Sequence, residues 1–240
     1  MINELKLKFP KIQEIKIILE AGHIYTNEEP NDEHRESVKY GKLLENYFSM
    51  FGAGIERWLF VDNYNPQFED NPEILNIGHY INLLANWEFP PEKIVYEADL
   101  VEQAHDVLSY LQRNNYALKN DKDKILLYKD KILLYDIKTE KYMCTLLDAC
   151  LYLNKLEQAD CCVTILNQQY SHQQKGTLTI LKKLDVEIEK IFPFFYPTPG
   201  KSIQPPLYPH IYSEQKTSFV KPVIDLLKII EELSGSFCGD

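Results

Sequence analysis

Apolar runs of strand length alternate with longer amphipathic stretches along most of the chain, and this alternation constrains the fold more than any other feature. Parallel strands are buried on both faces and need a crossover connection, which a helix usually supplies. The pattern therefore predicts an α/β fold with a mostly parallel sheet and flanking helices. The strands expected in this sheet are 14–19, 57–61, 93–96 and 161–166.

Amphipathic helices are expected wherever apolar residues recur three or four positions apart. The stretches with this spacing are 34–51, 74–87, 100–114, 145–156, 172–184 and 220–233. Residues 124–128 and 131–136 are shorter and flank Lys129 and Asp130. They are expected to form an inserted antiparallel β-hairpin.

Prolines mark a change of organisation toward the C-terminal end of the chain. Six of them fall between residues 192 and 209, so this segment is expected to be a loop or an extended arm. The simplest division of the chain is an α/β domain over residues 1–190, followed by a Pro-rich arm and a C-terminal helix over residues 191–240.

The balance of charge disfavours several classes of partner. The chain has 36 acidic and 26 basic residues, and its formal charge of −10 repels nucleic acid unless a basic patch is segregated on one face. No apolar run has the length of a membrane span, and the first ten residues lack the apolar core of a signal peptide. We therefore expect a cytoplasmic protein that binds no membrane and, without a basic patch, no tRNA.

Several common site motifs are absent from the sequence. There is no G-x-G-x-x-G, no G-x-x-x-x-G-K-[ST], no G-x-S-x-G and no H-E-x-x-H, which excludes the usual dinucleotide, P-loop, hydrolase and zinc-protease signatures. The five cysteines form no C-x-x-C pair, so we expect them to pack in the core and to hold neither a metal nor a disulfide.

Polar residues that directly follow the expected strands are the candidates for a binding site. In open α/β sheets, ligands collect at the carboxyl ends of the strands, where loops and helix N-termini converge. Asp62 with Glu97 or Asp99 offers oxygens to a divalent cation, but such acids more often cap helices or face water, so no metal site is predicted. The candidates at this edge are Glu20, His23, Asp62, Asn63, Asn65, Glu97, Gln169 and His172.

The order of elements resembles a known family. Residues 125–184, which run from ILLYKDKILLYD to GTLTILKKL, have a hairpin, a helix start similar to T-Y-x-x-R-D, a strand, and a helix opening similar to D-Q-x-x-H. Upstream, EHRESVKYGKLLENYFSMFG (33–52) and RWLFVDNYNPQF (57–68) look like the helix after the HIGH signature and the strand that follows it. Residues 12–184 thus resemble the Rossmann-like catalytic core of class I aminoacyl-tRNA synthetases, and among them the arginyl enzymes.

The resemblance implies roles for individual residues. Gln169 and His172 match positions that contact the amino acid and the nucleotide in the family, and Asp148 matches a substrate-binding aspartate. A carboxylate there would pair with a substrate cation through a charge-assisted hydrogen bond. ATP is the cofactor that the family uses, and His23 or His34 would then meet its phosphates or ribose.

The sequence also departs from the family pattern. Only one histidine of the HIGH pair can be in place, in AGHIYT (21–26) or EHRES (33–37), and Lys201 stands alone where the family has the lysines of KMSKS. Cys144 and Leu147 replace the tyrosine and arginine of T-Y-x-x-R-D. Each lost donor to the developing charge costs on the order of 10²–10³ in rate, so efficient adenylation is not expected.

Three functions remain open on this basis. The leading hypothesis is a stand-alone, diverged synthetase-like domain that binds an amino acid or related small molecule, with or without a nucleotide, for ligation or for acyl or nucleotidyl transfer. Catalysis would use His23, His34 and Lys201. This leading hypothesis requires Glu20, Asp62, Glu97 and Gln169 to share one pocket.

The first alternative is a catalytically inactive protein that keeps the fold and docks a protein partner through the Pro-rich arm. The second is an aminoacyl transferase of the cyclodipeptide-synthase type, which takes its aminoacyl groups from charged tRNA. Such an enzyme needs a serine after the first strand and a basic surface. The first strand here leads into Glu20-Ala21-Gly22-His23, and the net charge is negative.

Overall fold

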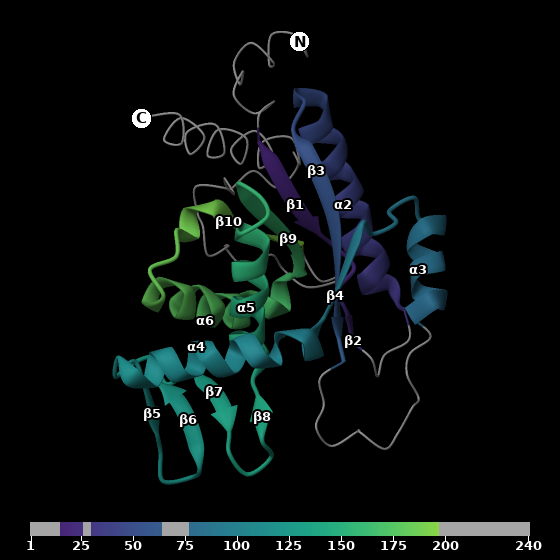
Figure 1. The fold of residues 1–240 in the computed structure, drawn as a ribbon. Coiled ribbons are helices and arrows are strands. Elements are labelled where there is room, and N and C mark those ends of the chain that lie inside the picture. Colours follow the sequence, from purple (N-terminus) through teal and green to yellow (C-terminus); the bar gives the residue numbers. More distant parts are fainter. Residues whose placement is uncertain (1–14, 26–29, 64–76, 197–240) are drawn as a thin grey trace, which may run out of the picture.

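The central sheet of the computed structural model is parallel and lies between two layers of helices (Figure 1). The structure describes residues 15–25, 30–63 and 77–196. Five strands follow one another across the sheet in the order β10-β9-β1-β3-β4, and β2 pairs with the last two residues of β3. The strands are β1 (Lys16–Glu20), β2 (Ile24–Tyr25), β3 (Gly54–Asp62), β4 (Lys93–Tyr96), β9 (Cys161–Asn167) and β10 (Ile191–Tyr196). The predicted α/β, Rossmann-like class is confirmed.

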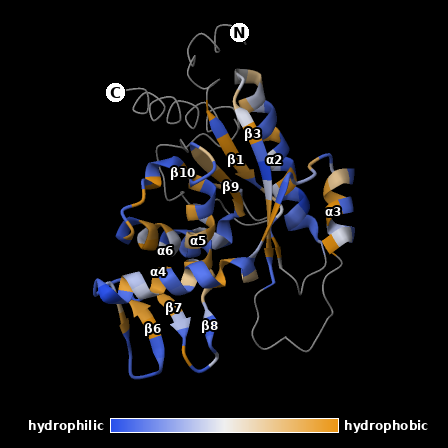
Figure 2. Ribbon diagram, in the orientation of Figure 1, coloured by the Kyte–Doolittle hydropathy of each residue, from blue (hydrophilic) through white to orange (hydrophobic). Residues whose placement is uncertain are grey.

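Strand residues alternate between two apolar cores, one on each face of the sheet. In β1, Ile17 and Leu19 join the core under α2 (Asp32–Phe51) and α3 (Ile77–Asn86), whereas Ile18 joins the core on the opposite face. That second core is covered by α4 (Val101–Arg113), α5 (Cys144–Leu156) and α6 (Ser171–Lys183). Figure 2 shows the resulting apolar strands in orange between helices with mixed faces. Burial on both faces explains why the strands are nearly continuous apolar runs.

A second, antiparallel sheet projects beyond α4 (Figure 1). It consists of β5 (Ala117–Lys119), β6 (Lys124–Leu127), β7 (Leu133–Asp136) and β8 (Lys141–Tyr142). The predicted hairpin is confirmed as β6 and β7, which pair in antiparallel register. The two- and three-residue strands β5 and β8 were not predicted, because runs that short carry no readable alternation.

The expected loop or arm from residue 192 is wrong for its first residues, because residues 191–196 form β10. This strand pairs in parallel with β9, with Pro193 opposite Thr164. Proline lacks an N–H donor but fits an edge strand, and β10 ends the row of described strands. The expected helix 220–233 and the rest of the arm lie outside the described residues, so the division of the chain at residue 190 stays a prediction.

The direction of the crossovers reverses between β1 and β9. The chain leaves β1 toward α2 on one face of the sheet and leaves β9 toward α6 on the other. The two strands are direct neighbours, with Ile17–Glu20 opposite Cys161–Thr164. A reversal of this kind opens a crevice at the carboxyl ends of the two strands, which is where α/β proteins bind their ligands.

Within the described parts of the chain, no helix is long and apolar enough to cross a membrane.

Candidate functional site

The turn after β1 is held by a glycine that no other residue replaces without strain. Gly22 has φ 74°, and its N–H donates to Ser37 Oγ at 3.0 Å. The Tyr80 hydroxyl donates to the Gly22 carbonyl oxygen at 2.7 Å. A Cβ at Gly22 would lie 3.0 Å from the Tyr80 hydroxyl oxygen. This turn brings His23 back over Glu20, the last residue of β1, so that His23 Nδ1 lies 3.7 Å from Glu20 Oε1.

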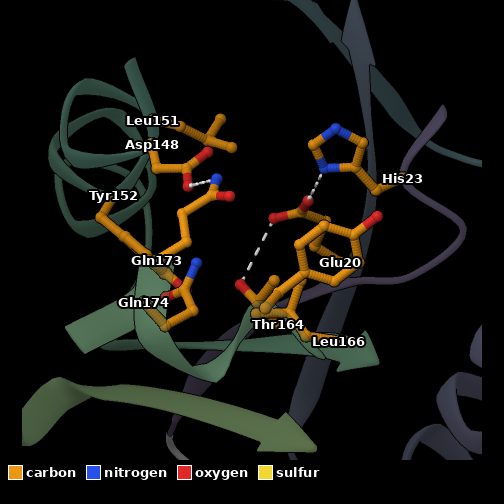
Figure 3. A pocket seen from close by; sticks show the side chains of 10 residues that line it. Glu20, His23, Asp148, Leu151, Tyr152, Thr164, Leu166, Gln173 and Gln174 are labelled. Atoms are coloured by element: carbon orange, nitrogen blue, oxygen red, sulfur yellow. Dashed lines mark hydrogen bonds and ion pairs between the residues drawn. The ribbon is translucent and has the colours of Figure 1, made fainter. Parts of the chain in front are cut away.

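A small cavity opens at the carboxyl ends of β1 and β9, and we call it the Asp148 cavity. In Figure 3, Asp148 and Gln173 lie on one side of it, and Glu20 and His23 lie on the other. The residues that line it are Glu20, His23, Asp148, Leu151, Tyr152, Thr164, Leu166, Tyr170, Gln173 and Gln174.

Glu20 is buried and already has a cation of its own chain. The Lys155 ammonium, which is fully buried, donates to Glu20 Oε2 and also to Thr164 Oγ1 at 3.0 Å. The Thr164 hydroxyl lies 3.3 Å from the same Glu20 oxygen. Burial alone would raise the pKa of Glu20, but Lys155 and His23 together lower it to about 2. Glu20 is therefore ionised and paired at physiological pH.

Asp148 is buried without such a partner. Its side chain is 7% exposed, and its Oδ2 accepts a hydrogen bond from the neutral amide of Gln173 at 2.8 Å. Burial raises the pKa of Asp148 to about 6, against the opposing effect of that hydrogen bond. Within residues 15–25, 30–63 and 77–196, no lysine or arginine forms an ion pair with it. Among the described residues, His23 and Lys155 therefore act on this carboxylate only through space, and no cation pairs with it directly.

Helix α5 carries Asp148 and Lys155, the partner of Glu20, on the same face. Asp148, Tyr152 and Lys155 are spaced i, i+4 and i+7, which aligns side chains along an α-helix. The Tyr152 hydroxyl donates to Gln174 Oε1 at 2.9 Å, and the Lys155 ammonium lies 4.7 Å from the centroid of the Tyr152 ring. Tyr152 therefore separates Asp148 from Lys155 along the helix.

A second small cavity adjoins the first and shares His23, Leu166 and Tyr170 with it. We call it the His34 cavity, after a buried residue in the first turn of α2. The side chain of Asn31 caps this helix by accepting from the N–H groups of Glu33 and His34. Burial and the nearby His23 lower the pKa of His34 to about 4, so its ring is neutral at physiological pH. The remaining lining residues are Glu33, Ser37, Ile165, Asn167 and Tyr196.

A third group of polar side chains lies where β3 and β4 end and α5 begins. One donor atom each from Asp62, Glu97 and Cys144 lies within 4.8 Å of the other two. Glu97 is 2% exposed, and burial together with the Glu97, Asp148 and Asp62 charges raises the pKa of the Cys144 thiol to about 12. Carboxylates and a thiolate are donors that could hold a divalent cation such as Zn²⁺.

The predicted site residues therefore lie along one edge of the sheet but not in one pocket. Glu20, His23 and Asp148 line the Asp148 cavity, His34 lines the second cavity, and Asp62 and Glu97 belong to the third group. Of the four residues expected to share one pocket, only Glu20 lines either of these two cavities, while Asp62 and Glu97 lie beside Cys144, one turn before Asp148 on α5.

Three predicted residues have other surroundings, and two cannot be placed. The Asn63 side-chain oxygen accepts from the N–H of Ala98. Gln169 and His172 are exposed and line neither cavity, and the Gln169 amide donates to Glu33 Oε2 at 3.4 Å. Asn65 and Lys201 lie outside the described residues. The roles assigned to all of these residues stay predictions.

The residues that sequence reasoning missed come from helices. The inner faces of α5 and α6 carry Lys155, Gln173 and Gln174. The candidates taken from the sequence were mainly polar residues that directly follow strands. One signal was present. Lys155 follows Asp148 by seven positions in a largely apolar helix, and a lysine on such a helix indicates a buried partner for a carboxylate.

Comparisons with known proteins bear on the fold alone. No known protein-family profile matches the chain, and no curated protein sequence matches it. Among solved structures, an arginyl-tRNA synthetase from Campylobacter jejuni is similar with a TM-score of 0.63 at 10% identity, over 82% of this chain and 60% of that one. The arginyl-tRNA synthetases of Thermus thermophilus and Plasmodium falciparum give TM-scores of 0.59 and 0.54 at 10% and 13% identity, each over 76% of this chain.

This chain spans 48% of the length of the Thermus structure and 43% of the Plasmodium structure. At these identities the likeness shows a shared fold, which is that of arginyl-tRNA synthetase domains.

Proposed function

We propose that this chain is a diverged synthetase-like domain that binds an amino acid or a related small molecule through a cationic group, and that Asp148 holds this group. The observation that carries the proposal is a buried carboxylate whose partner within the described chain is a neutral amide. A buried charge is costly unless it is paired, so a site that retains one is suited to a ligand of opposite charge. The similar structures are named for arginine, whose side chain carries a guanidinium.

The His34 cavity supports a second ligand or a second part of the same ligand. It opens beside the Asp148 cavity, and His23 lies between the two. A neutral His34 and the hydroxyl of Ser37 suit ribose hydroxyls or an uncharged group rather than bare phosphate charge. Two adjoining sites would allow ligation, or acyl or nucleotidyl transfer, by holding two reactants side by side.

Calorimetric titration with a matched pair of ligands tests the cation. Pentylguanidine and pentylurea have nearly the same shape, but only the first is charged. We expect pentylguanidine to bind at least about tenfold more tightly at pH 7.5, and Asp148→Asn to abolish this preference. A Glu157→Gln variant, at the exposed end of α5, also removes one negative charge and is the control for a change of net charge alone.

Equal affinity for the two ligands, or an unchanged preference in Asp148→Asn, would overturn the proposal. Titration of ATP alone and after saturation with pentylguanidine then tests the adjoining cavity. Binding of neither the guanidine, the urea, L-arginine nor ATP would leave the inactive interaction protein as the better explanation of the fold.

A further inference from the structure

Two carboxylates line the Asp148 cavity, but only one of them is open to a ligand cation. Glu20 and Asp148 lie on opposite sides of the cavity in Figure 3, and both are more than nine-tenths buried. Lys155 approaches Glu20 from behind, because Lys155 is not among the residues that line the cavity. The cavity therefore has one carboxylate neutralised by the chain and one that is not.

The ammonium of Lys155 is fixed by more than its charge. It donates to Thr164 Oγ1 at 3.0 Å, lies over the Tyr152 ring, and has no exposed surface. His23 adds a second nitrogenous group on the same side, 3.7 Å from the other Glu20 oxygen. Both Glu20 oxygens thus already face groups of the protein that can carry positive charge.

We propose that Lys155 is a positioning residue that occupies Glu20, so that the Asp148 cavity accepts a ligand with one cationic group and discriminates against a second one at the Glu20 side. This inference rests on the proposed function, because it takes Asp148 as the residue that holds the ligand's cation. The inference restricts the ligand to molecules with one cationic group at Asp148. At the end that meets Glu20, such a molecule has an acylated nitrogen, a neutral group in place of a nitrogen, or no nitrogen at all.

The physical reason is the cost of desolvating a charge without a new partner. A second ligand ammonium near Glu20 would lose its hydration and meet a carboxylate that Lys155 already neutralises. The Lys155 ammonium would repel it at short range in a poorly hydrated place. A neutral end of the same length meets neither penalty.

A matched pair of ligands measures this discrimination in the wild-type chain of 240 residues. Agmatine carries a guanidinium and an ammonium, and pentylguanidine has a methyl group where agmatine has the ammonium. We expect calorimetry at pH 7.5 to give a dissociation constant for agmatine about tenfold higher than that for pentylguanidine, which is the size of effect that one misplaced charge produces.

Variants of Lys155 show whether this residue sets the preference. Lys155→Met frees Glu20, so we expect the ratio of the two dissociation constants to reverse in favour of agmatine. Lys155→Arg changes the size of the side chain but keeps its positive charge, so we expect it to keep the wild-type ratio. If the shape of the lysine side chain rather than its charge set the preference, Lys155→Arg would change the ratio as well. Lys93→Met, at the amino end of β4, is the matched loss of a lysine away from the cavity.

The outcomes separate the two proposals. If wild type binds agmatine as tightly as pentylguanidine, or if Lys155→Met folds and leaves the ratio unchanged, the role of Lys155 is disproved while Asp148 can still hold a cation. If Lys155→Met does not fold, the milder Thr164→Val variant, which removes one partner of the ammonium, should shift the ratio toward agmatine. If pentylguanidine binds no better than pentylurea, the proposed function itself fails.

Discussion

Asp148 determines what the cavity can do, because it is a carboxylate that the fold keeps buried at a cost. Its carboxylate accepts from the Gln173 amide on α6, and its charge is influenced through space by His23, Glu20 and Lys155. Lys155 is committed to Glu20. Natural proteins keep such a destabilising group where function needs it, and replacing the group by a neutral one then increases the free energy of unfolding.

The sign of this cost can be tested without any ligand. Burial raises the pKa of Asp148 from 3.8 to about 6, so the folded state prefers the protonated form and loses stability as pH rises from about 4 through 6. Asp148→Asn should therefore increase the free energy of unfolding at pH 7.5, by on the order of 3 kcal/mol, and change it little at pH 4. Urea denaturation at the two pH values measures this. A variant less stable than wild type at pH 7.5 would show that the chain itself stabilises the charge.

Short elements around β1 position the site, and their geometry depends on single residues. The turn that carries His23 needs the left-handed conformation of Gly22 and its contacts with Tyr80 and Ser37. Helix α5 supplies both Asp148 and the lysine that neutralises Glu20. The site is thus assembled from one turn and one helix face, each in contact with the same strand pair.

A pair of glycine variants tests the turn. Gly22→Ala forces a side chain into φ 74° and places its Cβ 3.0 Å from the Tyr80 hydroxyl oxygen, so it should lower stability by about 1–2 kcal/mol and weaken pentylguanidine binding. Gly54→Ala, at the start of β3, is the control, because its Cβ meets no atom closer than the Ile15 oxygen at 3.8 Å. Thermal unfolding of both variants gives the comparison. Equal stability of the two would mean that the turn tolerates a side chain.

Elements of ordinary length could be predicted from the sequence, whereas elements set by tertiary contacts could not. The predicted helices 34–51, 100–114, 145–156 and 172–184 begin and end within two residues of their observed bounds, and 74–87 ends within one residue of α3, because their apolar stripes match the helical period. β10 was missed because Pro193 argues locally for a loop, and only its place at the sheet edge permits a strand.

At the scale of the whole molecule, the order of strands decides where chemistry can occur. The sequence predicted a parallel sheet with a site at its carboxyl edge, whereas the reversal between β1 and β9 follows only from the observed strand order. The sequence could not show which polar residues along that edge meet. That depends on how α5 and α6 pack across the sheet. Their packing brings Gln173 to the cavity and Lys155 to Glu20, while Asp62 and Glu97 join Cys144 instead.

The central claim is that a ligand cation completes the charge of the Asp148 cavity. A crystal structure of the chain with pentylguanidine tests it most directly. The account predicts the guanidinium within hydrogen-bond distance of Asp148, on the side of the cavity opposite Glu20, with the Lys155–Glu20 pair intact. A guanidinium bound to Glu20 in place of Lys155, or bound away from Asp148, would contradict the account.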